Sequence, residues 1–84
     1  MSQSFTMYRA HVSDTEEPTL RREIMAYTGC DEEASTILRG LERLGTDASI
    51  RYFEMTPQPN RRSYVGAPRV TWSVKAVRMI ESND

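Results

Sequence analysis

MAYTGCDEEAS, residues 25 to 35, separates two segments that have helical periodicity, and the fold depends on it. Gly29 interrupts the first segment, because glycine favours the left-handed conformation that ends a helix. Asp31 is placed to cap the second, and Glu32 and Glu33 fall in its first turn, where carboxylates favour the helix dipole. The stretch therefore predicts two helices joined by a tight turn.

Apolar residues flank this turn at helical spacing. Leu20, Ile24 and Tyr27 recur at i, i+4 and i+7, with Pro18 at the expected start, and predict a helix over residues 19–28. The following segment, residues 32–45, carries one apolar stripe and ends at a glycine suited to a C-cap. The residues concerned are Ala34, Ile37, Leu38, Leu41, Leu44 and Gly45.

Gly40 lies inside the second predicted helix, where glycine costs roughly 1 kcal/mol relative to alanine. Two interpretations stay open. Gly40 either marks a close approach of another segment to the helix backbone, or it is an exposed position with no special role.

The last third of the chain predicts a β-hairpin. SIRYFEMT (49–56) and RVTWSVKAV (69–77) are rich in β-branched and aromatic residues. The second alternates apolar and polar residues, which places Trp72 on the core side. Between them lies PQPNRRSYVGAP (57–68), a basic loop that is long for a hairpin, and long loops in small domains are often functional.

The N-terminal stretch SFTMYRAHV, residues 4–12, favours a short strand, but a helix is also compatible with it. The whole chain of 84 residues is expected to form one small α+β domain. Its expected parts are an N-terminal strand or arm (1–13), a helix-turn-helix (17–45), a hairpin wing (49–80) and a frayed tail (81–84).

The net charge of −1 conceals an uneven distribution. Residues 1–50 carry five Arg against nine Asp and Glu, a local charge of −4. Residues 51–80 carry five Arg and one Lys against one Glu, a local charge of +5. An acidic half joined to a basic half indicates that one face meets an anionic partner.

Several functional classes are not expected. His11 is the only histidine and Cys30 the only cysteine, so we expect no metal site, no cofactor and no catalytic activity. Cys30 is interpreted as a buried structural residue of a reducing compartment. No apolar run reaches the length of a membrane span or a signal peptide, which predicts a cytoplasmic protein without membrane contact.

Over residues 19–77 the pattern of two helices joined at a glycine, followed by a hairpin with a basic loop, resembles the winged helix-turn-helix superfamily. The resemblance implies a non-enzymatic protein that binds double-stranded DNA, as a transcriptional regulator or a recombination accessory factor, with its second helix in the major groove. A single short module also implies a homodimer or cooperative binding. The DNA-contacting residues that it implies are Ser35, Thr36, Arg39 and Arg43 on the helix, and Arg61, Arg62, Tyr64 and Arg69 on or beside the wing.

A protein-interaction module on the same scaffold is the alternative. Asp31, Glu32 and Glu33 would then face a basic surface of a host protein, as in a phage or mobile-element inhibitor or adaptor. Carboxylates at the start of the second helix would be repelled by phosphates unless they point away from the DNA. Replacement of Glu32 and Glu33 with Lys separates the two hypotheses, because it should strengthen DNA binding under the first and destroy partner capture under the second.

Overall fold

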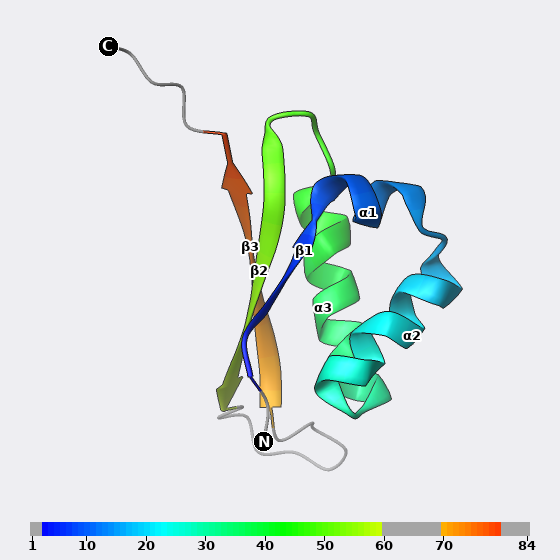
Figure 1. Ribbon diagram of the computed structural model, residues 1–84. Coiled ribbons are helices and arrows are strands. Elements are labelled where there is room, and N and C mark those ends of the chain that lie inside the picture. The colour runs from blue at the N-terminus through cyan, green and yellow to red at the C-terminus, as the bar shows by residue number, and fades with distance from the viewer. Residues whose placement is uncertain (1–2, 60–69, 80–84) are drawn as a thin grey trace.

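A computed structural model of the chain describes residues 3–59 and 70–79. The three helices lie on one side of a three-stranded antiparallel sheet of order β1-β2-β3 (Figure 1). The elements in chain order are β1 (Phe5–Tyr8), α1 (Arg9–Asp14), α2 (Glu17–Thr28), α3 (Asp31–Leu44), β2 (Ile50–Pro59) and β3 (Val70–Arg78). The predicted α+β class is confirmed at this level.

The N-terminal segment forms a strand and then a helix, so both alternatives for residues 4–12 are partly right. Phe5–Tyr8 pairs with β2, and Arg9–Asp14 follows as a short helix. Met7 and Val12 are both buried, with 7% and 8% of their surface exposed. The change from strand to helix therefore lets one short segment bury two apolar side chains against the same core.

The two predicted helices are present, with small differences at their ends. Helix α2 begins at Glu17, two residues before the predicted start, with Pro18 in its first turn. Helix α3 begins at Asp31, and Cys30 is its N-cap without a side-chain capping bond. The predicted cap at Asp31 is wrong, because that carboxylate is directed to another partner. Gly45 ends α3, and its N–H donates to the carbonyl oxygen of Leu41.

Tyr27 departs from the predicted apolar stripe of α2. It is 55% exposed, and Thr28 is buried instead. The ring of Tyr27 nevertheless stacks on that of Phe5, with centroids 4.1 Å apart and planes 6° from parallel. Helix α2 therefore contacts the edge strand through an aromatic pair at the surface.

Gly40 marks a close approach, which decides between its two interpretations. A Cβ built on Gly40 would lie 2.8 Å from Cγ2 and 2.9 Å from Cβ of Val74 on β3. Ordinary side chains at position 40 would push the helix away from the sheet, so the glycine sets the distance between α3 and β3.

The core lies between the helices and the inner face of the sheet. Apart from a register shift between Ile50 and Tyr52 in β2, the strands direct alternate side chains inward, and the predicted burial of Trp72 is confirmed at 6% exposure. The buried apolar residues are Met7, Val12, Leu20, Ile24, Ala34, Ile37, Leu41, Ile50, Phe53, Met55 and Trp72.

The hairpin is confirmed, but its first strand is longer than predicted. β2 continues through Pro59, and Pro57 lies opposite Trp72 in the ladder with β3. The first three residues of the predicted loop are therefore strand, and the rest of the loop lies outside the described residues. Among the described residues, no helix has the length and apolar character needed to cross a membrane.

Candidate nucleic-acid interface on helices α2 and α3

The turn between α2 and α3 consists of two residues, Gly29 and Cys30. Gly29 has a φ of 73°, and its N–H donates to the carbonyl oxygen of Met25. The hydroxyl of Thr28 accepts a hydrogen bond of 3.3 Å from the N–H of Cys30 and donates one of 3.1 Å to its carbonyl oxygen. The left-handed glycine and the buried threonine fix the direction in which α3 leaves the turn.

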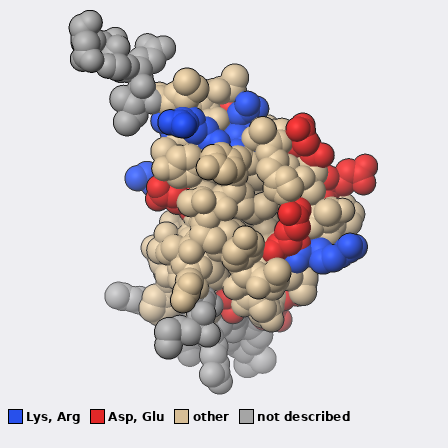
Figure 2. All heavy atoms as spheres, in the orientation of Figure 1, with Lys and Arg blue, Asp and Glu red and all other residues tan. Residues whose placement is uncertain are grey.

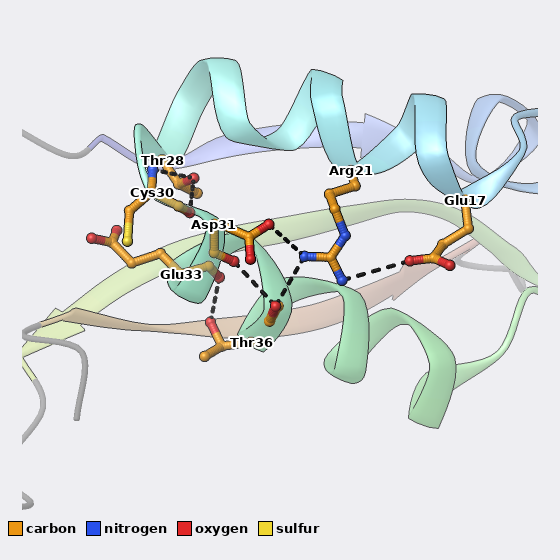
Figure 3. A network of polar contacts seen from close by, with 8 residues as sticks. Glu17, Arg21, Thr28, Cys30, Asp31, Glu33 and Thr36 are labelled. Carbon is orange, nitrogen blue, oxygen red and sulfur yellow. Dashed lines mark hydrogen bonds and ion pairs between the residues drawn. The ribbon is translucent and has the colours of Figure 1, made fainter. Parts of the chain in front are cut away.

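Arg21 connects the two helices at the start of α3. One guanidinium nitrogen donates to Asp31 Oδ1 at 2.8 Å and to the hydroxyl of Ser35 at 3.0 Å. A second nitrogen lies 3.6 Å from a carboxylate oxygen of Glu17, one turn earlier on α2. Figure 3 shows the Arg21 guanidinium between the two helices, with Glu17 and Asp31 on either side of it.

Glu33 points toward the sheet. Its Oε1 accepts a hydrogen bond of 2.9 Å from the indole N–H of Trp72 on β3. In Figure 3 the Glu33 side chain extends away from Arg21 and Asp31. The three acids at the start of α3 therefore have different surroundings: Asp31 faces Arg21, Glu33 faces Trp72, and Glu32 is exposed to solvent.

The helix residues implied by the resemblance divide into two pairs. Ser35 and Thr36 are half-buried, and their hydroxyls donate to the carbonyl oxygens of Asp31 and Glu33 at 3.1 and 2.7 Å. Arg39 and Arg43 are exposed and lie one turn apart on α3. Only the second pair presents groups that are free to meet a ligand.

Two hollows flank the exposed side of α3. The larger, of about 650 Å³, lies between α3 and the first two helices, with Leu20 and Leu41 among its apolar residues and Arg21 at its margin. The smaller, of about 560 Å³, is bordered by Thr36, Arg39, Gly40, Glu42 and Arg43. Arg39 and Glu42 border both hollows and form the ridge between them.

The implied wing residues Arg61, Arg62, Tyr64 and Arg69 lie outside the described residues. The described ends of the hairpin, Pro59 and Val70, lie opposite each other in the ladder. Trp72, two residues after Val70, contacts the start of α3. The basic segment therefore joins the sheet near the acidic end of α3.

Charges are separated over the surface. Figure 2 shows most of the visible Lys and Arg atoms at the upper end of the molecule and several Asp and Glu atoms on its helical side. Residues 13–33 carry seven carboxylates against two arginines, a local charge of −5. The exposed side of α3 is mixed, with Arg39 and Arg43 near its end and Glu32 near its start.

Cys30 differs from its predicted state, since it is half-buried and not fully buried. Its position at the turn, between Gly29 and the first residue of α3, leaves part of it at the surface. Within residues 3–59 and 70–79, no three His, Cys, Asp or Glu side chains are grouped as they would be to hold a metal ion.

Sequence reasoning missed Arg21 and the Glu33–Trp72 contact. A tryptophan on an inward-facing strand position needs an acceptor for its N–H, which was the available signal, but the pattern did not indicate which acceptor.

No family model, no curated protein and no solved structure matches the chain.

Proposed function

We propose that this protein is a small, non-enzymatic DNA-binding protein with a winged helix-turn-helix-like arrangement, a regulator or recombination accessory factor. The proposal is carried by one observation: α3 presents Arg39 and Arg43 on its exposed side, one turn apart, from a helix pair with a fixed two-residue turn. Guanidinium groups so placed can donate to phosphate oxygens or to guanine edges.

The orientation of the acids supports this proposal. Asp31 is paired with Arg21, and Glu33 is directed to the indole of Trp72. Of the three acids, Glu32 alone is exposed and has neither of these contacts. The repulsion between the start of α3 and DNA phosphates is therefore smaller than three free carboxylates would cause. The acids serve the fold and the first turn of the helix.

The hairpin also supports the proposal. Its two strands follow α3 directly and bring Pro59 and Val70 to the end of the sheet near the start of α3. The ten residues between them include Arg61, Arg62 and Arg69. We expect these arginines to bind phosphates beside the groove that α3 enters, and a homodimer or cooperative binding to extend the short contact of one module.

The test compares arginine variants in fluorescence anisotropy with labelled duplex DNA. Arg39→Ala with Arg43→Ala should weaken binding about tenfold or more at low salt, because two phosphate contacts are lost. Arg22→Ala is the matched control, since Arg22 is exposed on α2 and borders neither hollow. Equal affinities for the double variant and the control would refute the assignment of α3 as the DNA-contacting helix.

A second candidate function is capture of a basic partner protein, favoured by the local charge of −5 over residues 13–33. Glu32→Lys is the discriminating variant, because replacing Glu33 or Asp31 would also remove an internal contact. Tighter duplex binding by Glu32→Lys supports the DNA proposal. If Glu32→Lys instead abolishes binding to a basic partner protein and leaves duplex affinity unchanged, the second candidate function is supported.

A further inference from the structure

The face of the sheet opposite the helices carries an aromatic row at the end where β1 joins α1. Tyr8 lies opposite Tyr52, and Tyr52 opposite Val77. The two tyrosine rings have centroids 6.3 Å apart and planes 71° apart. Tyr8 is 69% exposed, so most of its ring is open to solvent.

A β-bulge adds an arginine to this row. Ile50 lies opposite Arg78 and Tyr52 opposite Val77, so Arg51 is the extra residue. Ile50 and Phe53 are both buried on the inner face, although regular alternation would direct residues three apart to opposite faces. The bulge therefore places Arg51 and Tyr52 side by side on the open face.

The surroundings of the row are basic. Arg9 follows Tyr8 and donates from Nε to the carbonyl oxygen of Ile50 at 3.0 Å. Lys75 lies in the next cross-strand row, opposite Glu54. Arg78, at the end of β3, is held by Asp47 at 3.0 Å. Arg78 lies opposite the inward-facing Ile50 and is therefore on the helical side of the sheet. On the open face itself, Arg51 and Lys75 stand against Glu54, an excess of one positive charge.

We propose that this open face binds single-stranded nucleic acid. An unstacked base can lie on the exposed ring of Tyr8, while Arg51 donates to the adjacent phosphate. A duplex cannot use the tyrosines in this way, because its bases are already stacked on one another. The exposed ring of Tyr8 beside the half-buried ring of Tyr52, together with a small excess of positive charge, distinguishes this surface from an apolar protein interface.

The remaining open-face positions fit an extended strand. The next two rows toward the hairpin end pair Thr56 with Ser73 and Gln58 with Thr71. Hydroxyl and amide groups can bond base edges or phosphates without a fixed sequence. The proposed single-strand site lies on the opposite side of the molecule from the exposed arginines of α3. Its test is therefore independent of the test of duplex binding.

Fluorescence anisotropy of a labelled single-stranded oligodeoxynucleotide of mixed sequence, added to the full chain, tests this proposal. Tyr8→Ala should weaken binding by about 5- to 150-fold, the range expected for one lost base stack. Tyr8→Phe keeps the ring and should bind like the wild type. Tyr27→Ala is the matched control, because Tyr27 is also exposed but lies on helix α2.

Arg51→Ala should weaken binding and reduce its salt dependence, whereas Arg39→Ala should leave single-strand binding unchanged. Circular dichroism and a thermal melt establish that each variant is folded. Absence of single-strand binding by the wild type, or equal binding by folded Tyr8→Ala and Tyr27→Ala, would overturn the proposal. Loss of duplex binding alone in the Arg39 variant bears only on the function proposed above.

Discussion

The indole N–H of Trp72 donates a hydrogen bond of 2.9 Å to Glu33 Oε1, and this bond joins the first turn of α3 to strand β3. The two residues are 39 positions apart in the chain. Trp72 is buried, so its N–H needs an acceptor from within the protein. Glu33, one of three consecutive acids in the sequence, is therefore part of the contact between helix α3 and the sheet.

Glu33→Ala should lower the free energy of unfolding by about 1–3 kcal/mol, because it leaves a buried donor without its acceptor. Glu33→Gln retains a carbonyl oxygen at the same reach and should lose less. Urea denaturation followed by the fluorescence of Trp72 measures both. Equal stability of the alanine and glutamine variants would show that the bond contributes nothing.

Gly40→Ala should destabilise the protein, although alanine favours a helix over glycine by about 1 kcal/mol. The added methyl group would meet Val74 atoms at 2.8 and 2.9 Å, and overpacking of this kind costs about 1–3 kcal/mol. A thermal or urea melt provides the measurement. Val74→Ala should partly rescue the variant, so the double-mutant cycle should show a favourable coupling. Simple additivity would contradict the close contact.

Asp47 should titrate at unusually low pH. Its pKa is lowered to about 2 from 3.8, first by the hydroxyl of Ser49, then by Arg78 and by the backbone N–H of Ser49. A depressed folded-state pKa stabilises the protein above the unfolded value, and that contribution is lost as pH falls from about 4 toward about 2. NMR titration of the Asp47 carboxyl measures the midpoint directly. Asp47→Asn should make stability less dependent on pH in this window, and an unshifted midpoint would contradict the contacts.

Glu42→Gln should raise affinity for duplex DNA by about two- to fivefold, as expected for removing one exposed charge from the ridge beside Arg39. Anisotropy with the labelled duplex measures the change. Glu23→Gln is a control on α2, where the carboxylate contacts His11 and borders neither hollow. The same gain from both variants would indicate a general charge effect and no contact at α3.

Local patterns predicted much of the fold. Periodicity placed α2 and α3, the glycines Gly29 and Gly45 marked the two helix ends, and alternation identified the inward face of β3. The N-terminal segment remained ambiguous because a strand and a helix follow each other there without a break. The end of β2 was missed because proline usually stops a strand, whereas this one contains Pro57 and ends at Pro59.

The candidate sites depend on contacts that periodicity cannot predict. Arg21 meets Asp31 only because a two-residue turn sets α2 against α3. The bulge at Arg51 becomes visible only through the register with β3. The pairing of Tyr8 with Tyr52 likewise needs the sheet order. Such features arise between distant segments, whereas sequence patterns describe one segment at a time.

The central claim, that this protein binds duplex DNA through α3, is tested most directly by titrating labelled random-sequence duplex at two salt concentrations. With about five phosphate contacts, two from α3 and three from the wing arginines, we expect an affinity loss on the order of 500-fold between about 50 mM and about 200 mM salt. The Arg39→Ala, Arg43→Ala double variant should bind more weakly and lose less over the same range. Absent binding at the lower salt, or wild-type affinity that does not change with salt, would contradict the claim.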